Sequence, residues 1–151
     1  KRGKDIPREH WQDYVFGYSC LMDIVVRGKE ERVARKAFDT FCPVGPWIMT
    51  ADELGDPSNL RGRLWVNDEL RQDANTRDLI VDIPGMIEIA SHIMTLEPGD
   101  IIAAGTPAGV GPIKGGDYVK IEFEKIGSMT IMVKQTSGGR ASIFETTAAV
   151  S

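Results

Sequence analysis

One carboxylate of this chain stands inside an apolar stretch, where a charged side chain is unusual. Asp23 lies near the middle of Tyr18–Val26, and this run of apolar and β-branched residues predicts a buried strand. A carboxylate in such a place is costly unless it is paired or bound to a cation. Either Asp23 binds a hard metal ion such as Mg²⁺, or it caps a loop or pairs with Arg27.

Arg27 extends this candidate site. It follows Asp23 at an even spacing, so an extended backbone would direct both side chains to the same face. That face would then present an anionic metal site next to a cation that can hold a substrate carboxylate. The predicted chemistry is the binding of a metal ion together with an acidic substrate.

Two further positions carry groups that chemistry could use. Gly105-Thr106-Pro107 follows the predicted strand Ile101–Ala104 directly. At a strand end, backbone N–H groups and the Thr106 hydroxyl can meet an anion, although a tight turn explains the same residues. Lys36 stands just before Phe38-Asp39-Thr40-Phe41, and by residue type alone it is a solvated surface lysine.

Other catalytic arrangements fit the sequence less well. Glu122 and Glu124 alternate along a predicted strand but stand among lysines, which favours a solvated face over a metal site. Ser91 and His92 are neighbours on a predicted helix, where His92 is expected to be partly buried. They cannot face each other, which argues against a Ser–His–Asp triad. The glycine-rich stretch 105–116 follows neither the dinucleotide-binding nor the Walker pattern.

Composition places this 151-residue chain among globular proteins, with one domain or part of one. The formal net charge of −4 argues against a nucleic-acid-binding module. No apolar run reaches membrane-spanning length and no signal-peptide pattern is present, so we expect no membrane partner and a cytoplasmic location. Cys20 and Cys42 lie in apolar surroundings without a CxxC partner, which predicts buried, reduced thiols.

Short strands and one clear helix must position these residues. Strands are predicted at 18–26, 47–50, 101–104, 118–124 and 129–134. Asn67-Asp68 between β-prone flanks indicates a hairpin. Pro84 stands at the first turn of a helix predicted over 84–95, and Pro7 can open a shorter one. Several short strands with one good helix predict a mainly β, α+β domain.

Several segments together resemble the fumarylacetoacetate hydrolase family. Residues 17–27 (GYSCLMDIVVR) resemble its GYTxxNDVSxRD stretch, and residues 36–47 (KAFDTFCPVGPW) are nearly identical to its KSFDTFCPLGPW segment. Residues 94–111 (MTLEPGDIIAAGTPAGVG) resemble its MTLEPGDVIxTGTPxGVG segment, and shorter matches such as Arg71-Gln72 lie between them. Several long motifs in the same order are far more specific than any single one.

The resemblance implies a fumarylacetoacetate hydrolase-like β-roll, usually assembled as a homodimer, with Mg²⁺ or Mn²⁺ as its cofactor. It implies that Asp23 is a metal ligand and that Lys36 is the catalytic lysine. It further implies that Arg27 binds the substrate, together with Gly105 and Thr106 of the glycine-rich loop.

The chain departs from the family pattern in ways that blur the substrate more than the fold. Met22 replaces the usual Asn before the metal-binding aspartate, and Gly28 replaces the Asp after the arginine. The family also has an upstream Glu-x-Glu pair as further metal ligands, and nothing before Asp23 has that pattern. We therefore expect residues 1–151 to be part of a single catalytic domain of a longer protein, with 136–151 as a flexible tail.

By resemblance, the metal ion would bind the 1-carboxylate and 2-oxo group of a 2-oxo or 2,4-dioxo acid and stabilise the enolate formed when a C–C bond breaks. Arg27 would hold the second carboxylate, and Lys36 would stabilise charge or move a proton. One hypothesis is a hydrolase of the acylpyruvate or fumarylacetoacetate type. Another is a decarboxylase or isomerase of unsaturated dicarboxylates from aromatic catabolism, such as 2-hydroxyhepta-2,4-diene-1,7-dioate. The last is a non-catalytic homologue that binds an acid or a partner subunit.

Overall fold

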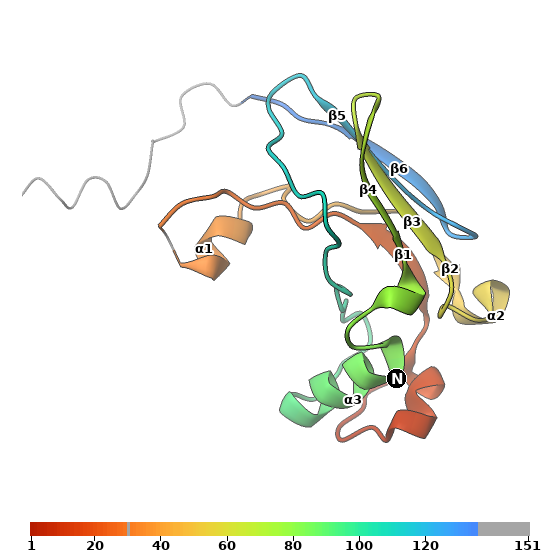
Figure 1. The fold of residues 1–151 in the computed structure, drawn as a ribbon. Coiled ribbons are helices and arrows are strands. Elements are labelled where there is room, and N and C mark those ends of the chain that lie inside the picture. Colours follow the sequence, from red (N-terminus) through yellow and green to blue (C-terminus); the bar gives the residue numbers. More distant parts are fainter. Residues whose placement is uncertain (30, 136–151) are drawn as a thin grey trace, which may run out of the picture.

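The computed structural model describes residues 1–29 and 31–135. Its strands form two antiparallel sheets, one of two strands and one of four in the order β4-β3-β5-β6 (Figure 1). The smaller sheet pairs β1 (Gly17–Leu21) with β2 (Val44–Thr50). The larger sheet consists of β3 (Arg61–Val66), β4 (Glu69–Asn75), β5 (Tyr118–Phe123) and β6 (Gly127–Met132).

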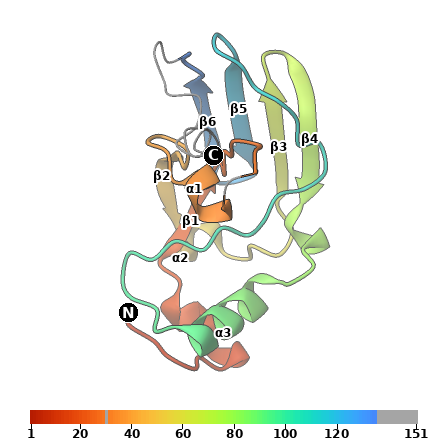
Figure 2. The same cartoon turned by 90° about the vertical axis from the view of Figure 1, so that its left-hand side faces the viewer.

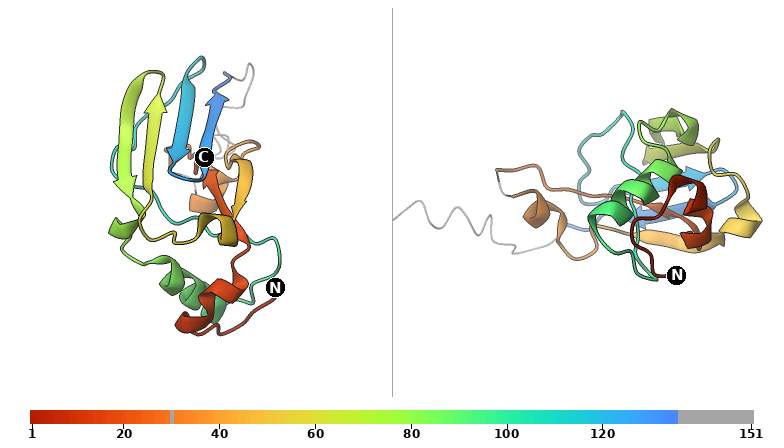
Figure 3. Two further views of the ribbon diagram at one scale, coloured as in Figure 1. Left: turned by 90° about the vertical axis from the view of Figure 1, so that its right-hand side faces the viewer. Right: turned by 90° about the horizontal axis from the view of Figure 1, so that it is seen from below.

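Short helices surround the sheets. The 3₁₀ helix η1 (Arg8–Tyr14) and helix α3 (Ile83–Ile93) pack together at one end of the molecule, where α3 lies beside the N-terminal segment (Figure 3). Helix α1 (Arg32–Lys36) stands on an arm that leaves the sheets after β1 (Figure 1). The remaining helices are α2 (Ala51–Leu54) and η2 (Thr76–Asp78). Within the described ranges, no helix has the length and apolar character that crossing a membrane requires.

The main core lies between the four-stranded sheet and β1. Val66 of β3 and Val119 and Ile121 of β5 alternate with exposed or half-buried neighbours, as expected of strands with one buried face. These side chains pack with Cys20 of β1 and Leu54 of α2. The packing of Cys20 against the four-stranded sheet therefore positions the end of β1, from which the chain continues to Asp23.

A smaller apolar cluster fastens the N-terminal segment to α3. Ile6, Ile87 and Leu96 bury their side chains against one another. Ser91 is fully buried beside them. Its hydroxyl accepts a hydrogen bond from the Ile6 N–H at 2.9 Å and donates one to the Glu88 carbonyl at 3.0 Å.

Replacing Ser91 by alanine is expected to lower the free energy of unfolding by about 1–3 kcal/mol, because the buried Ile6 N–H loses its acceptor. Ser128 is an exposed serine of β6 and is the matched control. Ser128→Ala should change the free energy of unfolding by no more than about 0.5 kcal/mol. Urea unfolding followed by circular dichroism measures both variants, and equal effects would contradict this role of Ser91.

The predictions that rest on neighbouring residues agree with the structure at the hairpin and at the main helix. The Asn67-Asp68 hairpin is confirmed, and Asn67 adopts a φ of 56°, a conformation that asparagine tolerates in tight turns. The helix predicted from Pro84 is confirmed as α3, where Asp82 accepts a hydrogen bond from the Gly85 N–H at 3.1 Å. The partial burial predicted for His92 is wrong, since its side chain is 82% exposed and Ser91 faces the interior instead.

Predictions that depend on distant pairing were less accurate. No strand forms at 101–104, where Ile101 is 64% exposed and no neighbouring strand pairs with it among the described residues. The strand predicted over 18–26 ends at Leu21, and β2 begins at Val44 instead of at residue 47. Cys20 is buried as predicted, but Cys42 is exposed. The expected flexible tail, 136–151, lies outside the described residues.

Candidate active site

The chain around Asp23 folds back on itself and brings α1 toward it. After β1, the N–H of Ile24 donates to the Phe41 carbonyl at 2.9 Å, and the N–H of Val26 donates to the Arg35 carbonyl at 3.1 Å. Lys36 is the last residue of α1 and a turn at 38–40 follows it, so both lie between those two acceptors in the sequence. The two backbone bonds hold the end of α1 beside the Asp23 segment, within reach of the Asp23 carboxylate.

Asp23 points away from the core. Met22 is buried and Ile24 packs against the main core, so the alternation of an extended backbone places the Asp23 side chain on the other side. The carboxylate is 34% exposed and lies in direct contact with the Lys36 ammonium, which is 49% exposed. The expectation that Asp23 sits in a buried strand is therefore wrong, and its ionic partner is Lys36 instead of Arg27.

Arg27 lies at the outer end of this segment. Its side chain is exposed and takes part in none of the ion pairs found within residues 1–29 and 31–135. The backbone hydrogen bond from Val26 to Arg35 holds the preceding residue. The location of Arg27 on the same face as Asp23, and its contact with a substrate, remain predictions.

The glycine-rich loop is positioned separately, against β4. Gly105 adopts a φ of 101°, a conformation that glycine reaches without strain, and Thr106 next to it is exposed. The Gln72 amide of β4 donates a hydrogen bond to the Pro107 carbonyl at 3.2 Å. In the described part of the chain, no hydrogen bond joins Thr106 to Asp23 or Lys36. The predicted site residues thus form an ion pair and a loop that the structure does not link directly.

The described residues do not complete a metal site. No group of three histidine, cysteine or acidic side chains in them is arranged to hold a metal ion. Glu122 pairs with Arg63 at 2.6 Å and with Lys120 at 2.9 Å, which matches the predicted role of a solvated strand face. Mg²⁺ and Mn²⁺ take about six ligands from oxygen-rich sites, and Asp23 is a single carboxylate. Asp23 by itself therefore does not make a metal site, and the described residues place no second and third acidic, histidine or cysteine ligand around it.

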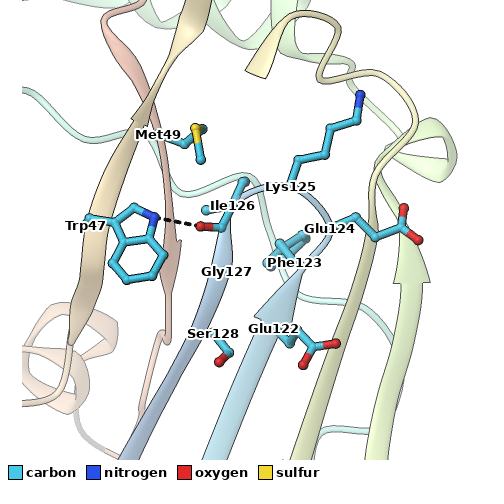
Figure 4. Close-up of a pocket in the computed structure, with 9 residues that line it drawn as sticks. All are labelled: Trp47, Met49, Glu122, Phe123, Glu124, Lys125, Ile126, Gly127 and Ser128. Atoms are coloured by element: carbon cyan, nitrogen blue, oxygen red, sulfur yellow. Dashed lines mark hydrogen bonds between the residues drawn. The ribbon is translucent and has the colours of Figure 1, made fainter. Parts of the chain in front are cut away.

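An open groove of about 430 Å³ lies elsewhere, between β2 and the turn that joins β5 to β6 (Figure 4). Trp47 lines one side, and its indole N–H donates to the Ile126 carbonyl at 2.8 Å. Lys125 and Ser128 line the groove on the side of the turn. It contains none of the predicted site residues, so its volume does not mark the candidate active site.

Comparison with known proteins finds one family over most of this chain. The model of the fumarylacetoacetate hydrolase C-terminal family matches residues 1–134. The maleylpyruvate hydrolase of Aquipseudomonas alcaligenes is 47% identical over 134 residues, which are 89% of this chain and 47% of that protein.

Solved structures agree with this relationship. The maleylpyruvate hydrolase of Sphingobium sp. SYK-6, in complex with manganese(II) and pyruvate, is 60% identical with a TM-score of 0.87, and the match covers 91% of this chain and 51% of that one. The 2-hydroxyhepta-2,4-diene-1,7-dioate isomerase of Mycobacterium marinum is 42% identical with a TM-score of 0.81, covering 86% of this chain and 52% of that one. The predicted mainly β fold is confirmed by these likenesses. The chain spans about half the length of the relatives that it matches.

Proposed function

We infer the function from the premise that this chain belongs to the fumarylacetoacetate hydrolase family, and we propose that it hydrolyses a C–C bond of an acylpyruvate-type 2,4-dioxo acid. The contact between Lys36 and Asp23 carries the proposal, because it joins the lysine and the aspartate that the family resemblance implies for this chemistry. The 60% identity to a maleylpyruvate hydrolase with bound pyruvate supports the same class of substrate.

The reaction adds water across one C–C bond. Water attacks the acyl carbonyl, the bond to the methylene carbon breaks, and a carboxylic acid leaves together with the enolate of pyruvate. The Lys36 ammonium would stabilise the negative charge that develops on oxygen, or would give the proton that the enolate carbon takes up. Arg27 would hold the carboxylate at the far end of the substrate, and the backbone of Gly105 with the Thr106 hydroxyl would hold the other anionic group.

The proposed reaction includes a divalent metal ion that Asp23 would bind. The related maleylpyruvate hydrolase structure contains manganese(II), and a metal ion of this kind supplies a Lewis acid for substrate oxygens. We propose Mg²⁺ or Mn²⁺ as the cofactor, with Asp23 as one ligand. Within the described residues, Asp23 is the one ligand that we propose, since no group of three possible ligands is arranged around it.

A second candidate function is isomerisation or decarboxylation of an unsaturated dicarboxylate. The likeness to a 2-hydroxyhepta-2,4-diene-1,7-dioate isomerase at 42% identity favours it specifically. The same lysine and arginine would serve both reactions, since each passes through an enolate. A non-catalytic homologue that binds an acid or a partner subunit is the remaining alternative.

Product analysis separates these functions. With maleylpyruvate and Mn²⁺, we expect pyruvate to be released, measured by coupling to lactate dehydrogenase. With 2-hydroxyhepta-2,4-diene-1,7-dioate, ultraviolet spectra report isomerisation without release of pyruvate. Turnover of 2-hydroxyhepta-2,4-diene-1,7-dioate alone would contradict the hydrolase proposal and support the isomerase. Binding of both acids without turnover would support the non-catalytic alternative.

We also propose that the protein is a cytoplasmic homodimer. Ile89 and Ile93 of α3 are 50% and 71% exposed and lie one helical turn apart, which supports an association through that side of the helix. Light scattering at micromolar concentration measures the mass of the particle. A particle of one polypeptide would contradict the dimer.

A further inference from the structure

The loop that carries Gly105 and Thr106 forms no helix or strand of its own. Residues 101–114 contain no regular secondary structure, and all of 101–112 are exposed. A loop of this length in a folded protein is usually functional, and a loop that contacts a substrate must be held in one conformation. The contacts that hold it therefore matter for the site.

The loop packs against the outer strand β4 and runs beside it (Figure 2). A Cβ atom on Gly109 would lie 1.8 Å from the Arg71 carbonyl oxygen, so the two backbones approach too closely for any other residue. A Cβ on Gly111 would lie 2.7 Å from a guanidinium nitrogen of Arg71. The side chain of Gln72 adds the hydrogen bond to the Pro107 carbonyl at 3.2 Å.

The far end of the loop is held by a different group. Asp117 is buried, and its carboxylate accepts hydrogen bonds from the Lys114 N–H at 2.9 Å and from the Asn67 amide at 3.2 Å. These two bonds hold the pKa of Asp117 below its usual range. Within the described residues, the bond from Gln72 is the one side-chain hydrogen bond to 101–113. The conformation near Thr106 therefore depends on Gln72 and not on Asp117.

We propose that Gln72 is a positioning residue for the substrate-binding loop, and this rests on the proposed function. Its amide fixes the Pro107 carbonyl, and hence the plane of the peptide that follows Pro107. The proline ring fixes the φ angle of the same residue. Together they hold the Gly105-Thr106 backbone and hydroxyl in the direction that meets an anionic substrate group.

Isosteric variants of Gln72 separate positioning from mere packing. Gln72→Met keeps the length of the side chain but cannot donate, and we expect kcat/KM for maleylpyruvate to fall about 10- to 100-fold with little change in the melting temperature. Gln72→Glu places a carboxylate against the Pro107 carbonyl, so at neutral pH its kcat/KM should be lower still than that of Gln72→Met. Gln12 has an exposed side chain, and Gln12→Met is the matched control, with expected wild-type kinetics.

The pH dependence of Gln72→Glu is the sharper readout. A carboxyl group regains a donor when it is protonated, and the ordinary pKa of glutamate is about 4.3. The ratio of the variant's kcat/KM to that of the wild type should therefore rise as the pH is lowered from 7 toward 5. The same ratio for Gln72→Met should stay constant, and a constant ratio for both variants would overturn the positioning role.

The outcomes distinguish this proposal from the proposed function. An active wild type with unchanged kinetics in Gln72→Met would overturn the positioning role and leave the function standing. A wild type that turns over neither acid would contradict the proposed function. Thermolysin cleavage before Val110 would then test, without turnover, whether Gln72 holds the loop against β4. We expect this cleavage, detected by mass spectrometry, to be several-fold faster in Gln72→Met than in the wild type, and equal rates would contradict the positioning role as well.

Discussion

Replacing Lys36 by alanine should lower kcat about 10²- to 10³-fold, while KM changes much less. Lys36 contacts the Asp23 carboxylate, and in the proposed reaction its ammonium would lie where negative charge develops. The loss of one electrostatic or proton-transferring group in such a position typically costs this much in rate. Steady-state kinetics with saturating Mn²⁺ measures the effect.

The fold should survive this change. Both side chains of the ion pair are partly exposed, and pairs of this kind contribute at most about 1 kcal/mol to stability. Arg32 stands one turn earlier on α1 and is exposed, so Arg32→Ala should keep the wild-type kcat and serves as the control. Circular dichroism confirms that both variants are folded.

Arginine should not replace Lys36. A guanidinium is bulkier than an ammonium and does not readily give up its proton, so Lys36→Arg is expected to remain slow. A wild-type kcat in Lys36→Ala would remove the residue from the catalytic site. The roles proposed for Arg27 and Thr106 would then lose their support too, because they come from the same family resemblance.

The sequence revealed those parts of the fold whose signals are local. The Asn67-Asp68 turn and the Pro84 helix start each depend on a few neighbouring residues, and both are present in the structure. Two strands near the C-terminus were also found within a few residues of their ends, because alternation along β5 and β6 is visible in the sequence itself.

The errors concern segments whose conformation is set by distant partners. Ile101–Ala104 has the composition of a strand, but a strand requires a neighbour with free N–H and C=O groups, and this segment has none among the described residues. The strand predicted from residue 47 begins earlier, so Gly45 and Pro46 lie inside β2, where Cys20 of β1 pairs with Gly45. No local pattern could show that pairing.

The candidate site divides in the same way. Asp23 attracted attention through a local conflict between its charge and its apolar neighbours. Its contact with Lys36 was not predicted, because it depends on the backbone bonds that Ile24 and Val26 make to residues later in the chain. Gln72 had no signal of its own beyond a short match to the family, since its importance comes from a loop that lies far along the sequence.

The second large effect is expected at Asp23, and it concerns metal affinity. Asp23→Asn replaces an anionic oxygen ligand by a neutral amide of the same shape, which hard cations bind far less well. Loss of a group that only supports a ligand typically costs about 10- to 100-fold in metal affinity. Loss of a ligand should cost at least as much, so we expect Mn²⁺ to bind the variant more than about 100-fold more weakly.

Electron paramagnetic resonance of free Mn²⁺ measures this affinity without reference to turnover. Asp39 is an exposed acid of the neighbouring turn, so Asp39→Asn removes the same charge close by and controls for general electrostatic attraction. If Asp23 is a ligand, only Asp23→Asn should lose the ion, and kcat should fall with it at any fixed Mn²⁺ concentration below saturation. Equal Mn²⁺ affinity in the wild type and Asp23→Asn would show that the Asp23 carboxylate serves to hold Lys36, and that any metal ion binds through other residues.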